Sequence, residues 1–327
     1  MKNLQWTEPQ TVEQALAWLA KANGKAVLMA GGTDLFTEIK EGVVEPELVI
    51  DLKSIPGLAS IQRDESGIRI GALTSVAGLA ADAMIKRDYP GLSEAAGSLA
   101  TPQLRNVGTV GGNLCQRPRC WYYRDAQMVC RKKGGSQCFA AKGRNKYHAI
   151  FGGRICHIVY PSDLAPMLIA LDAQVTISSP RGDRSLPLAE FYALPEKNVR
   201  RENILAPEEL VREVKLPPAK KGTRSAYVKL KERETWDFAL VSAAVRGTAS
   251  GGGLGEAAIV LGGVAPIPWR LGKTEAAIKG KKLSAAVIKE ALRADIQEAR
   301  PLEENGYKLA LVEAAVTRAL LSLMGPA

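Results

Sequence analysis

The segment MAGGTDL, residues 29–35, places two glycines directly after a short apolar run, residues 26–30, that predicts a buried strand. Glycine lets the backbone turn sharply and approach a ligand closely. Successive N–H groups in such a turn can form an anion-binding nest, and Thr33 and Asp34 add side-chain hydrogen bonds. An isolated GG pair is more often a plain turn, and this segment matches neither GxGxxG nor a P-loop, because no GK[ST] follows.

A second glycine-rich segment, NVGTVGGNL at residues 106–114, strengthens the case for a ligand. Its three glycines leave a backbone edge with few side chains, and Thr109 and Asn113 are its polar groups. We expect this edge to lie against a ring system and to donate N–H groups to it. Two such segments in one chain predict a large nucleotide-type cofactor that is held at two places.

Helix-like and strand-like patterns alternate along the chain and predict an α+β fold. TVEQALAWLAKANG has one apolar stripe and predicts a helix that Thr11 caps and Gly24 ends. In KLPPAKKGTR, residues 215–224, two prolines and a basic, glycine-containing stretch indicate a domain edge. Three strand-like segments and then three helices follow it.

Composition excludes several classes of protein. The net charge of +10 comes from dispersed lysines and arginines, with neither a basic stripe nor interleaved aromatic residues, so we expect no nucleic-acid partner. No apolar run approaches about 18 residues, so we expect no membrane span. The N-terminus lacks the apolar core of a signal peptide, which favours the cytoplasm unless a partner subunit's signal carries the chain to the periplasm.

Four cysteines lie close together in the sequence with the spacing C-x9-C-x7-C-x17-C: Cys120, Cys130, Cys138 and Cys156. The CxxC pairs typical of zinc knuckles and thiol-redox sites are absent. Four thiolates can hold an iron–sulfur cluster, whose ligand spacing is looser, and six nearby lysines and arginines would offset its negative charge. Cysteines that bind structural zinc remain an alternative. We interpret the only two histidines, His148 and His157, as hydrogen-bonded structural residues.

Four segments carry a resemblance to a known family: LMAGGTDL, TPQLRNVGTVGGNL, PSDLAP and YVKLKERETWDFALVSAAV. In this order they resemble the FAD-carrying medium subunits of the molybdenum hydroxylases, which include xanthine dehydrogenase, carbon monoxide dehydrogenase, 4-hydroxybenzoyl-CoA reductase and bacterial aldehyde oxidoreductases. The resemblance implies a two-lobed FAD-binding domain of the PCMH type over residues 1–217. It also implies a C-terminal α+β domain over residues 222–327, with a three-stranded sheet and helices.

The resemblance also implies which residues contact FAD. Val211 and Lys229 would lie near the isoalloxazine ring, where the lysine would stabilise the anionic reduced flavin. The chain shows no catalytic acid–base set of its own. The implied FAD-binding residues are Leu28, Met29, Ala30, Gly31, Gly32, Thr33, Asp34, Leu35, Leu99, Ala100, Thr109, Gly111, Gly112, Asn113, Ser162, Asp163, Val211 and Lys229.

Minimal members of the family lack the segment at about residues 115–160, and some members carry a 4Fe–4S site there. The resemblance therefore implies a 4Fe–4S cluster on Cys120, Cys130, Cys138 and Cys156, with Cys115 left as a small residue near the flavin. The chain would be the electron-transfer subunit of a heterotrimer. Its partners would be a 2Fe–2S small subunit and a large molybdopterin subunit that transforms the substrate.

Aldehyde oxidation is the activity that the resemblance favours, with electrons flowing from molybdenum to FAD and an external acceptor. A reductive enzyme of the 4-hydroxybenzoyl-CoA reductase type, with the opposite electron flow, stays open. Two alternatives come from other classes of protein: a stand-alone flavin oxidoreductase and a zinc-stabilised binding module.

Overall fold

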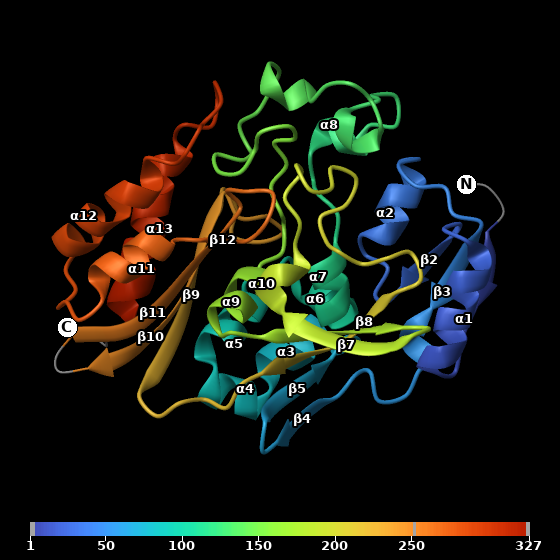
Figure 1. The fold of residues 1–327 in the computed structure, drawn as a ribbon, viewed down its shortest axis with the longest axis horizontal. Helices are drawn as coiled ribbons and strands as arrows, with labels where there is room; N and C mark the ends of the chain where they lie inside the picture. Colours follow the sequence, from blue (N-terminus) through green and yellow to red (C-terminus); the bar gives the residue numbers. More distant parts are fainter. Residues whose placement is uncertain (1–3, 251–252, 325–327) are drawn as a thin grey trace.

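The computed structural model describes residues 4–250 and 253–324. The expected domain ranges, 1–217 and 222–327, extend at their outer ends to residues that lie outside this description. Figure 1 shows three groups of helices and strands and, at the top in green, an irregular segment. The described strands form sheets of three, four and five strands. The α+β class predicted from the alternating patterns is confirmed.

The N-terminal sheet is parallel, with the strand order β1-β3-β2. Helix α1 packs its apolar stripe of Val12, Ala15, Leu16 and Leu19 against it. The Thr11 side chain accepts the N–H of Gln14 and caps this helix, as predicted. The helix ends at Ala22, and its cap residue Asn23 and the predicted Gly24 both have a positive φ. The elements are β1 (Gln5–Thr7), α1 (Val12–Ala22), β2 (Ala26–Met29), α2 (Leu35–Lys40), β3 (Leu48–Asp51) and the 3-10 helix η1 (Leu52–Ser54).

The central sheet is antiparallel, with the strand order β4-β5-β8-β6-β7. Its inner face and the neighbouring helices form one continuous core, to which α9 contributes only buried residues. The strands are β4 (Ile61–Asp64), β5 (Gly67–Gly71), β6 (Gln174–Ser179), β7 (Gly182–Pro187) and β8 (Leu210–Leu216). The helices are α3 (Val76–Ala81), α4 (Ala83–Asp88), α5 (Pro90–Gly97), α6 (Pro102–Val107), α7 (Val110–Cys115), α9 (Leu164–Ala170) and α10 (Leu188–Phe191).

The C-terminal sheet is antiparallel and has four strands, in the order β12-β11-β10-β9. The expectation of three strands was wrong by one, because the two-residue strand β12 pairs with the edge of β11. Three helices pack on this sheet in a second core. The elements are β9 (Thr223–Leu230), β10 (Val241–Ser250), β11 (Gly253–Gly262), β12 (Trp269–Arg270), α11 (Gly272–Ile278), α12 (Ala285–Ile296) and α13 (Lys308–Ser322).

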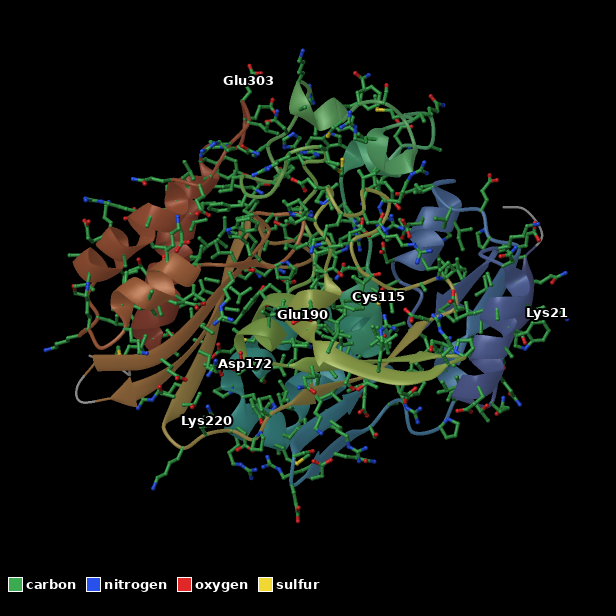
Figure 2. All side chains as sticks on the ribbon, in the orientation of Figure 1. Lys21, Cys115, Asp172, Glu190, Lys220 and Glu303 are labelled. Atoms are coloured by element: carbon green, nitrogen blue, oxygen red, sulfur yellow. The ribbon has the colours of Figure 1, made fainter. Side chains whose placement is uncertain are left out.

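The segment at residues 116–160, called the insertion below, lies between α7 and α9 and holds only three short helices. These are α8 (Trp121–Arg124) and the 3-10 helices η2 (Arg131–Lys133) and η3 (Phe139–Ala141). The insertion lies at the top of Figure 1. Figure 2 labels Glu303 beside it, in the segment of the C-terminal domain that precedes α13.

The C-terminal domain holds one end of the insertion by buried hydrogen bonds. The Nζ of fully buried Lys308 donates to the carbonyl oxygens of Tyr147 (3.0 Å) and Gly263 (2.7 Å). The side-chain amide of Asn305 donates to the carbonyls of His148 (3.1 Å) and Ala149 (3.2 Å). Since unpaired buried polar groups are costly, these contacts fix the backbone at residues 147–149.

Candidate functional site

The loop between β2 and α2 presents free backbone donors. Among the residues that the structure describes, the N–H groups of Gly31, Gly32, Thr33 and Asp34 donate to no protein acceptor. Gly32 adopts a φ of 70°, a conformation that glycine takes without strain. Successive free N–H groups in such a turn suit an anion such as a pyrophosphate.

The second glycine-rich segment differs from the expected loop, because residues 110–115 form helix α7. Thr109 caps it and accepts the N–H of Gly112 at 3.1 Å. The N–H of Gly111 donates to the Ala72 carbonyl at 2.8 Å. The prediction that this edge donates N–H groups to a cofactor is therefore wrong for Gly111 and Gly112. The small residues serve close packing, since a side chain on Gly111 would meet Ala72 at 2.8 Å.

The two glycine-rich segments lie against each other. A side chain on Gly31 would meet the carbonyl oxygen of Val107 at 2.2 Å, so only glycine allows this approach. One on Gly112 would lie 4.0 Å from the Ala30 side chain. The structure therefore brings together the loop after β2 and the start of α7, which are about 80 residues apart in the sequence.

Asn113, Ser162, Asp163 and Lys229 also come together. The Ser162 hydroxyl donates to Asn113 Oδ1 at 2.6 Å, which joins α7 to the start of α9. Asp163 accepts bonds from Lys229 Nζ (2.8 Å) and from the hydroxyl of Tyr227 (2.7 Å), and all three side chains are buried. The ammonium of Lys229 is thus neutralised by a carboxylate, which weakens the expectation that it supplies a free positive charge to reduced flavin.

The remaining expected contacts divide into two groups. Leu99 and Ala100 are partly exposed, Ala100 has a φ of 44°, and its carbonyl accepts the N–H of Trp236 at 3.2 Å. Val211 of β8 lies in the buried core, where it is paired with Ile177 of β6.

Asp34 contacts the insertion. Its carboxylate accepts the backbone N–H of Arg117 (2.7 Å) and the guanidinium of Arg124 (2.7 Å), and it pairs with Arg119 at 3.1 Å. One turn further on, buried Glu38 accepts the hydroxyl of Tyr123 at 2.8 Å, and burial raises the pKa of this carboxyl group. The loop after β2 and the insertion are therefore joined directly.

The sequence analysis did not identify the acidic side chains on one face of α2 and at its two ends. Asp34, Glu38 and Glu41 follow i, i+4, i+7 spacing, which places them on one side of a helix. Arg124 Nη1 lies 3.7 Å from Glu41, and Glu202 pairs with both Arg117 and Lys132. Most of the cations that we expected to offset a cluster's charge are thus paired with carboxylates.

The four clustered cysteines line one small pocket, and Cys115 does not line it. Cys138 and Cys156 are hydrogen-bonded to each other, which lowers the pKa of the Cys138 thiol and raises that of Cys156. Cys115 lies at the end of α7, near the middle of the molecule in Figure 2, and burial raises its pKa to about 12. Cys115 therefore lies apart from the pocket that the other four cysteines line.

The four thiols are the side chains of this pocket that could hold a metal group. Within residues 4–250 and 253–324, no three Cys, His, Asp or Glu side chains converge closely enough to hold a single ion. Four cysteines are a ligand set that both a 4Fe–4S cluster and a tetrahedral zinc site use.

A cleft of about 370 Å³ adjoins this pocket. It is lined by Ser162 and Asp163 on one side, by Cys120 and His148 of the insertion on another, and by Phe238. Arg119 lies 4.9 Å from the ring centre of Phe238. The cleft thus runs from expected FAD contacts to one of the four cysteines.

Two family models match the chain. Residues 2–219 match the FAD binding domain in molybdopterin dehydrogenase, and residues 225–323 match the CO dehydrogenase flavoprotein C-terminal domain. No helix in the described part of the chain has both the length and the apolar character that a membrane span needs.

Curated relatives agree with these matches. The chain is 39% identical over 299 residues to the aldehyde oxidoreductase FAD-binding subunit PaoB of Escherichia coli K12, covering 90% of each chain. It is 29% identical to the carbon monoxide dehydrogenase medium chain of Hydrogenophaga pseudoflava, covering 95% of this chain and 94% of that one. A solved structure of carbon monoxide dehydrogenase from the latter organism matches with a TM-score of 0.78 at 28% identity, covering 98% of this chain and 97% of that one.

The substitution Gly31→Ala tests the close approach of the two glycine-rich segments. The added methyl group would overlap the Val107 carbonyl, so we expect the loop to move and most of the bound FAD to be lost while the fold is retained. FAD per chain would be measured by absorbance and the fold by circular dichroism. Gly272→Ala is the matched control, since a methyl group there meets nothing within 4 Å. Full FAD content in Gly31→Ala would remove this loop from the site.

The substitution Asp163→Ala tests the buried ion pair. It leaves the Lys229 ammonium buried and unpaired, which typically costs about 3–5 kcal/mol, and we expect this loss in urea unfolding together with weaker FAD retention. The double variant Asp163→Ala/Lys229→Met should recover part of the stability, because it removes both charges. A single variant as stable as the wild type would contradict this account of the pair.

Proposed function

We propose, from the premise that this chain belongs to the family of FAD-binding subunits of molybdenum-dependent dehydrogenases, that it passes electrons between FAD and a 4Fe–4S cluster within a heterotrimer. Membership rests on the two family matches, which together span residues 2–219 and 225–323. We also propose the domain division at residues 217–222, which these matches support. The observation that carries the proposal is the cleft that joins Asp163 to Cys120.

FAD supplies the exchange of electrons between one-electron and two-electron partners when it is bound. The free N–H groups of residues 31–34 would hold its pyrophosphate, while Thr109 and Asn113 fix the adjoining backbone. Asp163 lines the cleft, and its buried ion pair with Lys229 fixes the position of its side chain. The chain's own residues would thus bind and orient the cofactor.

The 4Fe–4S cluster is proposed for Cys120, Cys130, Cys138 and Cys156. These cysteines share one pocket, and the glycines at 134 and 135 make the turn that lies between Cys130 and Cys138. A side chain on Gly135 would meet the carbonyl oxygen of Val129 at 1.8 Å, so this turn requires glycine. Structural zinc is the competing occupant, and metal analysis separates the two.

Substrate chemistry is proposed to take place on a large molybdopterin subunit, with a 2Fe–2S small subunit between it and this chain. Aldehyde oxidation is favoured because the 39% identical relative is named as part of an aldehyde oxidoreductase. A reductive enzyme of the 4-hydroxybenzoyl-CoA reductase type would use the same residues with the opposite electron flow. A stand-alone flavin oxidoreductase is disfavoured, because the relatives are named as an FAD-binding subunit and a medium chain of larger enzymes.

Single serine substitutions test the four proposed ligands. We expect each change at residues 120, 130, 138 and 156 to lower iron and acid-labile sulfide well below about four per chain, because serine binds iron poorly. FAD should stay bound, since its expected contacts lie outside the insertion. The variants would be purified anaerobically and assayed for iron, sulfide and FAD.

Cys115→Ser is the matched control, because Cys115 lies outside the pocket, and its iron content should equal that of the wild type. Iron loss in this control would mean that the wrong four residues were assigned. Zinc without labile sulfide in the wild type would support the zinc-stabilised module instead.

Coexpression tests the assembly. We expect the chain to copurify with a 2Fe–2S subunit and a molybdopterin subunit encoded beside it, and the complex to oxidise aldehydes with an artificial acceptor. The isolated chain should show no aldehyde turnover. Aldehyde turnover by the isolated chain, after its metal content has been measured, would favour the stand-alone flavin oxidoreductase.

A further inference from the structure

His148 lies between the cysteine pocket and the cleft. Its backbone is fixed from two sides: its N–H donates to the Asn145 carbonyl at 2.9 Å, and its carbonyl accepts from Asn305. Its ring is buried and packs edge-on against Trp121, with 5.4 Å between ring centres. The ring therefore has little freedom to turn away from its neighbours.

The ring of His148 contacts one of the proposed cluster ligands. Its Nε2 atom lies 3.2 Å from the Sγ atom of Cys120, which is within hydrogen-bond distance for sulfur. An iron-bound thiolate has no proton to donate, so the proton of this bond must be on Nε2. Nδ1 is buried and has no partner among the described residues, which fits the acceptor nitrogen of a neutral ring.

His148 and Cys120 are also the two residues that line both cavities. The pocket of the four cysteines and the cleft that contains Asp163 have no other lining residue in common. Of the four cysteines, only Cys120 borders the cleft. The hydrogen bond from His148 is therefore made to the cysteine that faces the expected flavin.

We propose that His148 is a positioning residue that raises the reduction potential of the cluster by donating its Nε2–H to the sulfur of Cys120. The inference rests on the proposed function, because it requires the cluster. Hydrogen bonds to the sulfur ligands are among the factors that set cluster potentials. Adding an electron makes the thiolates more negative, so a donor stabilises the reduced form more than the oxidised form.

His157 provides an internal comparison. It is also buried and lies close to Cys138, but its ring makes no hydrogen bond to sulfur in the described structure. Its contact with Cys138 comes from its backbone N–H, which a side-chain substitution leaves in place. Of the two histidines, both in the described part of the chain, only His148 has a ring nitrogen within hydrogen-bond distance of a cysteine sulfur.

The test is a redox titration of the FAD-loaded full chain with dithionite, followed by EPR of the reduced cluster. His148→Leu removes the donor, and we expect its midpoint potential to become more negative with iron and FAD unchanged. His148→Gln keeps an N–H group and should restore most of the wild-type potential. His157→Leu should titrate as the wild type does. Equal potentials in wild type and His148→Leu would overturn the inference.

A second measurement applies if His148→Leu does not assemble a cluster. Wild-type chain with histidine labelled by ¹⁵N in the ring only should show a weak ¹⁵N coupling to the reduced cluster in pulsed EPR, and His157→Leu should keep it. The absence of that coupling also overturns the inference. A wild-type chain with no cluster signal at all would instead refute the proposed cluster itself, so the two failures are distinguishable.

Discussion

The Asp34 carboxylate is the contact on which the arrangement of the site depends. It belongs to the loop whose free N–H groups suit a pyrophosphate, yet its oxygens are used by Arg117, Arg119 and Arg124 of the insertion. Because the carboxylate is largely shielded from water, its loss would leave several donors unpaired. The first residues of the insertion are therefore held directly against the loop that is expected to hold FAD.

The opposite end of the insertion is fixed by a different part of the chain. Lys308 and Asn305 of the C-terminal domain hold the backbone at residues 147–149, next to the ring of His148. A segment with only short helices thus obtains its shape from two neighbours rather than from its own core. This explains how four cysteines with irregular spacing reach one pocket, whose wall is shared with the cleft.

The sequence predicted features that depend on local chemistry. Thr11 as a helix cap and the turn at Gly32 follow from residue type and spacing. Long-range packing decides features that the sequence did not show: Val211 is part of the core, the segment after Thr109 is a helix, and Lys229 is paired with Asp163. The acidic face of α2 was visible as i, i+4, i+7 spacing, but its partners lie about 85 residues away and no local pattern indicates them.

The most direct test of a cluster held beside the flavin is an anomalous difference map, collected at the iron absorption edge from anaerobically grown crystals of the full chain. The account predicts one strong peak surrounded by Cys120, Cys130, Cys138 and Cys156, with FAD density entering the adjoining cleft. A peak that appears only above the zinc edge, or an iron peak bound by Cys115, would contradict it.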